Sequence, residues 1–264
     1  MPEIITSSSN SKIKLVRALQ TRSRKRHAEA AFVAEGVRLL EEVFTAGWPV
    51  RFVLYDKSLS ERGRTLIKAF ETQQKVEVAE ITIERMSEIT DTETPQGILT
   101  VLERHPLPIP EKPTFIVIAD QIRDPGNLGS LLRTANAAGV DAVLVTPGTV
   151  DAFSPKVVRA GMGAHFHLPI EEHSWQELLN FLNDLPIFMA EMDSELPLWE
   201  AEFFQPCALL IGGEAFGASS MGEAIATHTV TIPMPGGAES LNAAVAAGIL
   251  ITEVLRQRYQ SKKE

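Results

Sequence analysis

The sequence predicts an α/β protein with two domains, the second of which is built on a parallel sheet. The chain has 264 residues, enough for two domains of about 100–150 residues each. Short apolar, β-branched runs alternate with segments of helical periodicity in both halves, which is typical of α/β folds. Between the halves, residues 105–113 contain four prolines, and repeated X-Pro steps favour an extended linker. The predicted domains are therefore residues 1–104 and 114–264, joined by this linker.

In the first domain, apolar spacing over residues 11–20 predicts a short helix, because Ile13, Val16 and Leu19 fall on one face. The polar run that follows, residues 21–30, is assigned no helix or strand. The remaining elements are expected to alternate in type. They are strand 31–36, helix 37–46, strand 50–55, helix 60–71, strand 76–79, helix 83–89 and strand 97–102.

In the second domain, six short apolar runs separated by helices predict a doubly wound parallel sheet with ligand sites at the carboxyl ends of its strands. The expected strands are 115–119, 142–145, 166–168, 187–190, 207–211 and 230–232. The expected helices are 128–138, 155–161, 175–182, 220–226 and 241–259. No Gly-x-Gly-x-x-Gly motif follows the first strand, which disfavours a dinucleotide site.

Composition narrows the class of protein further. Cys207 is the single cysteine, so an internal disulfide is excluded, and the six histidines show no zinc-ligand spacing. We therefore expect no metal. His165 and His167 flank Phe166 at strand spacing, which predicts a partly exposed strand edge. The N-terminus has no apolar signal-peptide core, and no window approaches the roughly 18 apolar residues of a membrane helix, so a cytoplasmic protein without a membrane anchor is expected.

The net charge of −9 is unusual for a nucleic-acid-binding protein, which is commonly basic. The basic charge is local, however, since residues 1–40 hold eight basic and three acidic side chains. Its densest part is Arg22, Arg24, Lys25 and Arg26, which we predict to contact RNA. The alternative is a solvated charged face.

Near the C-terminus, the segment IPMPGGAESLNAAVAAGIL (residues 232–250) runs from a Pro- and Gly-rich loop into an apolar helix through Ser240, Leu241 and Asn242. A helix start leaves unpaired N–H groups and a positive dipole end, so this loop predicts a site for a polar or anionic ligand group. The alternative is an ordinary helix with Ser240 as its N-cap.

Two further segments combine loops and glycines in the same way. Residues 120–145 contain Pro125, Gly126 and Gly129 before a helix, and residues 208–222 place glycines around a single carboxylate, Glu214. In this order, the three segments resemble the signature motifs of the SpoU (TrmH-like) RNA 2′-O-ribose methyltransferases of the SPOUT superfamily. Residues 1–104, with SSNSKIK and FVAEGVRLLEE, are similar to the ribosomal-protein-like RNA-binding domain that precedes the catalytic domain in many of these enzymes.

The resemblance implies roles for individual residues. The second motif has Ala215 where the family usually has Gly, which matters only if that position needs positive φ. The implied catalytic residues are Arg133, Asn127, Glu214, Ser240 and Asn242. The implied cofactor-binding residues are Gly212, Gly213, Ile232, Met234 and Leu241. Arg133 is placed beside the reacting hydroxyl, either as the base or, as we prefer because an arginine guanidinium gives up its proton only at great cost, as an electrostatic stabiliser.

The resemblance also implies an activity and an assembly. It implies transfer of the methyl group of S-adenosylmethionine to a ribose 2′-hydroxyl, in a catalytic domain whose last part is threaded into a deep trefoil knot. A homodimer through this domain is implied too, consistent with the apolar residues of the last helix (Leu241, Val245, Ile249, Leu250, Val254). Large-subunit (23S-type) ribosomal RNA is the favoured substrate, with transfer RNA as the alternative. A non-catalytic RNA-binding protein and a small-molecule enzyme that binds phosphate at residues 126–129 are hypotheses of other classes.

Overall fold

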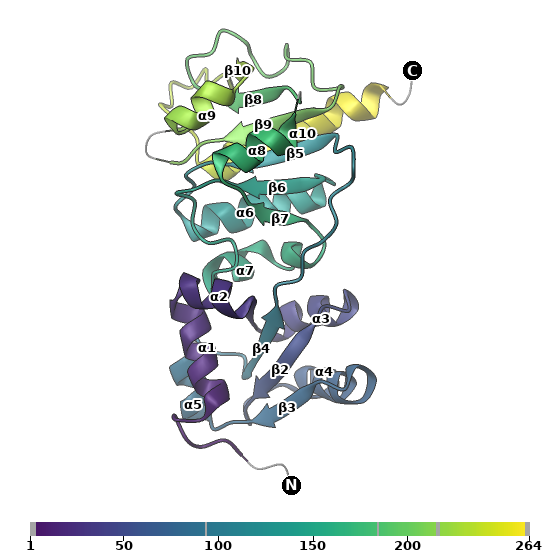
Figure 1. Ribbon diagram of the computed structural model, residues 1–264, viewed down its shortest axis with the longest axis vertical. Coiled ribbons are helices and arrows are strands. Elements are labelled where there is room, and N and C mark those ends of the chain that lie inside the picture. The colour runs from purple at the N-terminus through teal and green to yellow at the C-terminus, as the bar shows by residue number, and fades with distance from the viewer. Residues whose placement is uncertain (1–3, 93, 184, 215–216, 262–264) are drawn as a thin grey trace. The chain divides into compact units, whose positions relative to one another are not determined.

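The computed structural model describes residues 4–92, 94–183, 185–214 and 217–261. The chain forms two compact units (Figure 1). The first unit contains Met1–His105 together with Phe153–Phe166, and the second contains Pro106–Ala152 and His167–Glu264. Each unit has its own sheet and its own apolar core. No helix in the described part of the chain is long and apolar enough to cross a membrane.

The first unit is built on a four-stranded mixed sheet with the order β1-β4-β2-β3. Strand β4 (Ile98–Glu103) lies in the middle and pairs antiparallel with both β1 (Ala31–Glu35) and β2 (Val50–Tyr55). Strand β3 (Glu77–Glu80) extends the sheet by parallel pairing with β2. The register shifts between Val50 and Phe52, which marks an irregularity at the start of β2.

Helices cover this sheet much as their apolar spacing predicts. The expected apolar face of α1, formed by Ile13, Val16 and Leu19, is fully buried in the core. The polar run after α1, which was assigned no element, is in fact a helix. The helices of this part are α1 (Ser11–Thr21), α2 (Ser23–Glu29), α3 (Val37–Thr45), α4 (Glu61–Ala69), which continues as a π-helical turn (Phe70–Gln74), and α5 (Ile83–Ile89).

A later segment of the chain also packs into the first unit. Helix α7 (Pro155–Gly161) and a 3-10 turn (Ala164–Phe166) belong to it, and α7 contacts β1. The Phe32 ring lies 5.1 Å from the ring of Phe153 and 6.5 Å from that of Phe166, measured between centroids. This aromatic cluster joins strand β1 to a segment more than 120 residues further along the chain.

The 3-10 turn corrects two expectations about this segment. No strand forms over residues 166–168, because the backbone turns through positive φ at Met162 and Gly163 just before it. The strand β7 (Ile170–Glu172) forms a few residues later. His165 is 2% exposed and lies among aromatic rings, so it does not form a partly exposed edge.

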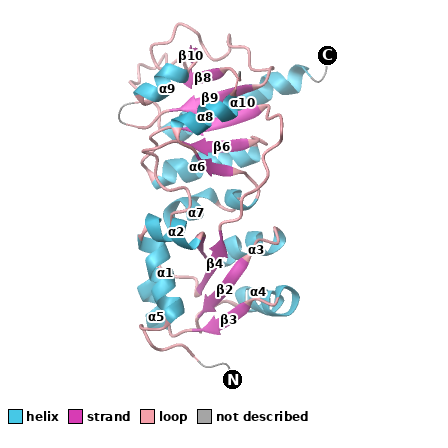
Figure 2. Ribbon diagram, in the orientation of Figure 1, coloured by secondary structure: helices cyan, strands magenta, loops and turns pink. Residues whose placement is uncertain are grey.

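The second unit is built on a six-stranded sheet with the order β10-β8-β9-β5-β6-β7, and every pair in it is parallel (Figure 2). This confirms the predicted doubly wound parallel sheet. The remaining strands are β5 (Phe115–Ala119), β6 (Ala142–Val145), β8 (Ile187–Ala190), β9 (Cys207–Ile211) and β10 (His228–Val230). The helices are α6 (Pro125–Ala137), α8 (Trp175–Leu182), α9 (Ser220–Ile225) and α10 (Ala243–Ser261).

The last helix, α10, packs against α6 and β9 (Figure 1). Its residues Leu250 and Val254 are fully buried, whereas Leu241, just before it, and Val245 and Ile249 are 36–50% exposed. The five apolar residues expected to form one face are therefore divided between the core and the surface. The surface set leaves an apolar stripe on α10.

Candidate functional site

The three glycine-containing loops meet at the carboxyl ends of β5, β9 and β10 and at the start of α10. After β5, the Asp124 carboxylate accepts a hydrogen bond from the Asn127 backbone N–H at 2.8 Å and so acts as the N-cap of α6. Pro125 occupies the first turn, where its missing N–H costs nothing. The helix thus begins at Pro125 and not at residue 128, and Asn127 is not its cap. The Asn127 side chain is left available for other contacts.

A chain of hydrogen bonds joins all three loops through that side chain. Asn127 Nδ2 donates to Glu214 Oε1 at 2.7 Å, and Asn127 Oδ1 accepts from Asn242 Nδ2 at 2.8 Å. Asn242 Oδ1 in turn accepts from the backbone N–H groups of Ala244 and Val245. A carboxylate can only accept, so the orientation of both amides is fixed along the whole chain of bonds.

This arrangement identifies Asn242, and not Ser240, as the N-cap of α10, because its side chain pairs two otherwise unpartnered N–H groups of the first turn. The network runs from the positive end of the α10 dipole to the negative charge of Glu214, an electrostatically favourable direction. Residues from three separate motifs are therefore held in one fixed arrangement.

The environment of Glu214 favours its ionised form. Partial burial raises the pKa of this carboxyl, but hydrogen bonds from the Asn127 side chain and from the backbone N–H groups of Glu214, Arg123 and Asp124 outweigh it, and the net pKa lies below the ordinary value of 4.5. The Arg123 backbone N–H lies 3.3 Å from Glu214 Oε2. Glu214 is thus a fixed acceptor at neutral pH and is poorly suited to give or take a proton there.

Gly212 and Gly213, which follow β9, are needed for steric reasons. A Cβ at Gly212 would collide with the backbone of Gly217 and Ala218, and one at Gly213 would collide with the carbonyl oxygen of Gln121. Gly213 and Gly217 also exchange two backbone hydrogen bonds, of 2.8 and 3.1 Å, which close the loop around Glu214. The position expected to matter next, Ala215, lies outside the described residues.

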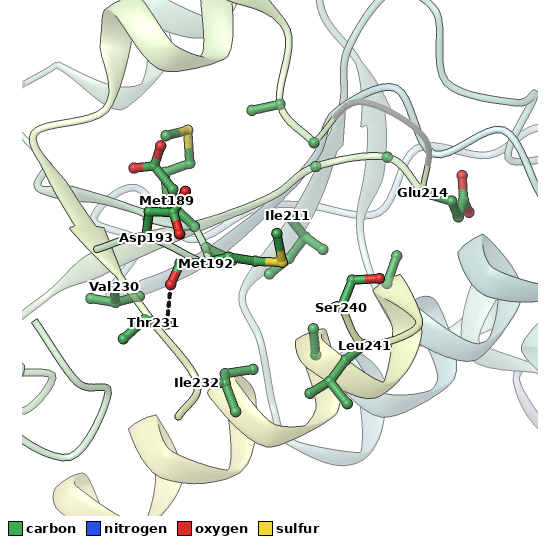
Figure 3. A pocket seen from close by; sticks show the side chains of 18 of the residues that line it. Met189, Met192, Asp193, Ile211, Glu214, Val230, Thr231, Ile232, Ser240 and Leu241 are labelled. Atoms are coloured by element: carbon green, nitrogen blue, oxygen red, sulfur yellow. Dashed lines mark hydrogen bonds between the residues drawn. The ribbon is translucent and has the colours of Figure 1, made fainter. Parts of the chain in front are cut away.

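The loops enclose a cavity of about 490 Å³, a size typical of small-molecule sites. Figure 3 shows residues that line this cavity, among them Ile232, Leu241 and Glu214, with Glu214 drawn apart from Met189 and Asp193. All five residues assigned to the cofactor line it: Gly212, Gly213, Ile232, Met234 and Leu241. Ser240 and Glu214 line it as well.

The cavity also offers main-chain donors. The backbone N–H groups of Ile232, Met234 and Leu241 make no hydrogen bond with any other residue that the structure describes. Main-chain N–H groups that line a cavity and have no partner in the protein can donate to a polar or anionic group of a ligand. No lining residue is a lysine, arginine or histidine.

Arg133 is placed differently from the other predicted catalytic residues. It lies on the exposed face of α6, does not line the cavity, and its side chain makes no hydrogen bond or ion pair within the described parts of the chain. Within one chain, Glu214 is engaged by Asn127 and the backbone of Arg123 and does not orient Arg133.

Sequence reasoning missed one wall of the cavity. The residues that directly follow β8, Glu191, Met192 and Asp193, line it together with Met189 from the strand itself. Thr231 Oγ1 donates to the Met192 carbonyl oxygen at 2.8 Å and ties this wall to the loop after β10 (Figure 3). Their position in the sequence could have indicated them, because they directly follow a predicted parallel strand, and ligand sites lie at the carboxyl ends of such strands.

A second missed residue is Asp120 at the end of β5, which is fully buried. Its carboxylate accepts from Thr146 Oγ1 at 2.6 Å and from the Ser219 backbone N–H at 2.7 Å. Both oxygens are thus used to tie β5 to neighbouring loops, which is a structural role.

The four predicted RNA contacts lie on or next to α2 in the first unit. Arg22 and Arg24 are exposed, and Lys25 pairs with Glu29 at 2.6 Å. Arg26 is only 4% exposed, and its guanidinium donates to the carbonyl oxygen of Leu19 at 2.5 Å. This corrects the expectation for Arg26, whose charge is used inside the protein to satisfy the carboxyl end of α1.

Comparison with known families matches both units. Residues 114–252 match the SpoU rRNA Methylase family, and residues 10–100 match the MRM3-like substrate binding domain. The chain is 32% identical to a 23S rRNA (uridine(2479)-2′-O)-methyltransferase of Streptomyces viridochromogenes, over 97% of this chain and 93% of that protein. It is 31% identical to the 23S rRNA (guanosine(2553)-2′-O)-methyltransferase RlmP of Bacillus subtilis (strain 168), over 94% and 97% of the two chains.

Solved structures give the same result. The SpoU methyltransferase AviRb from Streptomyces viridochromogenes, in complex with the cofactor AdoMet, superposes with a TM-score of 0.84 at 30% identity, covering 95% of this chain and 100% of that one. The AdoMet-bound rRNA methyltransferase from Sinorhizobium meliloti gives a TM-score of 0.84 at 28% identity, covering 96% and 97%.

Proposed function

The chain belongs to the SpoU rRNA methylase family, and from this premise we propose that it transfers the methyl group of S-adenosylmethionine to a ribose 2′-hydroxyl of large-subunit ribosomal RNA. The observation that carries the proposal is the hydrogen-bond chain Asn242–Asn127–Glu214, which joins three loops at the edge of one cavity. Relatives that span nearly the whole chain are named as 23S rRNA 2′-O-methyltransferases, which favours this RNA over transfer RNA.

The cavity fits S-adenosylmethionine on the chemistry of its walls. Gly212 and Gly213 are placed where any side chain would collide, and the free N–H groups of Ile232, Met234 and Leu241 can donate to the polar edge of an adenine or to a carboxylate. Apolar side chains of Met189 and Ile211 offer contacts for the rest of the molecule. When bound, S-adenosylmethionine supplies an electrophilic methyl group on a sulfonium.

The residues of the chain must then orient the ribose and manage the proton of its 2′-hydroxyl. We assign Asn127, Ser240 and Asn242 to holding the loops and the ribose, and Glu214 to holding Asn127. Arg133 contacts the adjacent phosphate and stabilises the negative charge that develops on the 2′ oxygen, while the proton of the hydroxyl leaves to water. Positioning and electrostatic stabilisation are the two contributions expected of the site.

We further propose a homodimer through the surface formed by α6 and α10. Leu241, Val245 and Ile249 are exposed there, and Arg133 projects from the neighbouring helix without entering the cavity of its own chain. A two-fold interface would bury these apolar side chains and bring a second Arg133 to the same surface. Light scattering that gives a mass near 29.0 kDa at micromolar concentration would contradict this assembly.

The remaining parts of the proposal concern the chain as a whole. We infer that residues 1–104 bind the RNA substrate, with Arg22, Arg24 and Lys25 as surface contacts, that residues 105–113 link the domains, and that residues 114–264 catalyse. The chain's last part is proposed to form a trefoil knot at the cavity. Action in the cytoplasm is proposed because the relatives that span nearly the whole chain include 23S rRNA methyltransferases of bacteria.

One experiment tests the proposed reaction directly. Mapping 2′-O-methyl groups in total RNA from cells with and without the protein should reveal one ribose of large-subunit ribosomal RNA that depends on it. The purified protein should then transfer tritium from methyl-labelled S-adenosylmethionine to an unmodified transcript of that RNA. If the methylation that depends on the protein lies in transfer RNA, then transfer RNA is the substrate. If no RNA methylation depends on the protein, the proposed function is wrong.

A further inference from the structure

The first unit contains a groove of about 590 Å³ that none of the predicted RNA contacts lines. It is lined by the end of β1 and the start of α3, by Arg62 of α4, by the loop before β4, and by the α7 segment. The region that matches the substrate binding domain ends at residue 100, so Arg159 and Met162 of the α7 segment complete the groove from outside it. We name this the α3–α7 groove.

The backbone at the head of the groove is fixed by one glutamine. Gln96 Oε1 accepts a hydrogen bond from the Val37 backbone N–H at 2.9 Å, at the first turn of α3. Gly36, just before it, has a φ of 100°, a conformation that side-chain-bearing residues rarely adopt. The Nε2 amino group of Gln96 makes no hydrogen bond with any described residue and is exposed at the groove.

The charges of the groove divide into paired and unpaired groups. Arg62 donates to both carboxylate oxygens of Glu41, each at 2.5 Å, and the Glu35 carboxylate accepts from the Thr92 hydroxyl. In contrast, the side chains of Arg38 and Arg159 form no hydrogen bond or ion pair with the residues that the structure describes. Two guanidinium groups from separate parts of the chain therefore remain available to an anion.

Uncharged groups accompany these two cations. The Thr94 hydroxyl and the Gln96 amino group can hydrogen-bond to a base edge or a sugar, and Met162 is 46% exposed with a flexible thioether that suits a flat apolar surface. Leu39 adds a buried apolar wall. Cations, polar donors and an apolar surface within one groove match the three parts of a nucleotide, whereas a simple anion would need only the cations.

We propose that the α3–α7 groove holds an unpaired nucleotide of the RNA substrate, with its phosphates on Arg38 and Arg159 and its base or sugar against Gln96, Thr94 and Met162. The inference rests on the proposed function for the identity of the RNA. Arg carries no sequence information when it contacts phosphate, so these two residues contribute affinity and register. The side chains of Gln96 and Thr94, which can hydrogen-bond to the base or sugar, contribute the preference for one nucleotide.

The test is the salt dependence of RNA binding by the full-length protein. The probe is an unmodified transcript of large-subunit ribosomal RNA, measured by filter binding between about 50 and 200 mM salt. In the double variant Arg38→Ala/Arg159→Ala, the slope of log K against log salt should fall by about 1.4, since each contact to single-stranded RNA contributes about 0.7. Affinity at low salt should fall at least tenfold, and S-adenosylmethionine affinity should stay the same.

A matched control comes from the same unit. The double variant Arg17→Ala/Arg85→Ala also removes two positive charges, but both arginines are paired with Glu88, and its slope should change little. The variant Arg38→Lys/Arg159→Lys keeps the charges and should keep the slope. Gln96→Glu keeps the oxygen that holds Val37 but loses the free amino group, and should weaken RNA binding several-fold without changing the melting temperature.

The outcomes separate this proposal from the proposed function. If the Arg38/Arg159 double variant shows the same slope as the Arg17/Arg85 control, the groove has no role in RNA binding and the inference is overturned, whether or not the protein methylates the transcript. If the slope falls as expected but the wild-type protein methylates no RNA, the groove stands and the proposed function fails. Circular dichroism on each variant shows that it is folded before binding is compared.

Discussion

The cavity of the second unit and the α3–α7 groove of the first are of similar volume but are built in opposite ways. At the edge of the cavity, the side chains of Asn242, Asn127 and Glu214 bond to one another, and main-chain N–H groups of the lining have no partner among the described residues. In the groove, the Val37 backbone N–H is bonded to the Gln96 side chain, and the side chains of Arg38 and Arg159 form no bond with the described residues.

This difference matches the ligands we propose for each. A small ligand of fixed shape is best recognised by rigid groups, because little conformational entropy is then lost on binding. A long polyanion is best attracted by mobile charges that release its counterions. Changes to the cavity should therefore alter cofactor affinity without altering salt dependence, and changes to the groove should do the reverse.

The largest expected effect is on the methylation rate, and it comes from Arg133, which lines neither the cavity nor the groove. Arg133→Ala should lower the single-turnover methylation rate by about 10²–10³, the loss typical of one preorganised donor. Arg133→Lys should lower it less, since the charge stays but the planar two-pronged donor is lost. S-adenosylmethionine affinity, measured by calorimetry, should match the wild type because Arg133 does not line the cavity.

The pH profile of the Arg133→Lys variant distinguishes the two roles considered for this residue. If Arg133 acts by electrostatic stabilisation, the variant should show no new rising limb between neutral pH and about 10, where a lysine base would titrate. A new limb with unchanged cofactor affinity would show that a base is required at this position and would overturn the electrostatic role.

The next largest effect is expected at the glycines of the cavity wall. Gly213→Ala places a Cβ against the carbonyl oxygen of Gln121, so the loop after β9 must shift, at a typical cost of about 1–3 kcal/mol. Cofactor affinity should fall at least tenfold. Gly236→Ala is the matched control, because a Cβ there meets no atom within 4 Å and the residue has no positive φ. Equal affinities for the two variants would show that the wall is not part of the cofactor site.

The fold and the cavity were largely predictable because both depend on local sequence. Buried strands such as 115–119 and 207–211 are short β-branched or apolar runs, and the residues at their carboxyl ends lie close together in any parallel sheet. Asn127, Glu214 and Asn242 each sit next to such a strand or a helix start. It was the family resemblance of the three motifs, however, that implied a shared site for these three residues.

The groove and the α2 helix were not predictable for the opposite reason. Arg38 and Arg159 are 121 residues apart and line one groove because the α7 segment packs on β1, where Phe153 and Phe166 contact Phe32, and this tertiary contact has no periodic signal in the sequence. The run at residues 21–30 looked like a solvated charged segment, yet burying Arg26 against the end of α1 makes part of it helical. Tertiary partners decided both features.

A smaller effect is expected from a single-atom change in the network of the cavity. Asn127→Asp removes the donor to Glu214 and places two carboxylates next to each other, so the pKa of one of them must rise. Cofactor affinity should fall about tenfold at pH 7.5, the order of a lost hydrogen bond to a charged group. It should recover at about pH 5.5, where a shared proton restores the donor. The wild-type protein, whose Glu214 pKa is already lowered, should show no such recovery.

The smallest effect concerns stability in acid, and it tests whether the Glu214 network contributes to folding as well as to binding. Because the folded-state pKa of Glu214 lies below its ordinary value of 4.5, its contribution to stability is present above about 4.5 and is lost as the pH falls through the folded-state pKa. The melting temperature of the wild type should therefore exceed that of Glu214→Gln at pH 6, and the difference should shrink towards pH 3.5.

The control for this effect is Glu177→Gln. Hydrogen bonds from the Ser174 hydroxyl and backbone N–H lower the pKa of Glu177 in the capping box of α8, far from the cavity lining. Its melting temperature should converge with that of the wild type in acid in the same way, since the linkage is the same. Only Glu214→Gln should also weaken cofactor binding at neutral pH. If both variants bind the cofactor as the wild type does, Glu214 serves the fold alone, and Asn127 must be oriented for catalysis by its bond to Asn242.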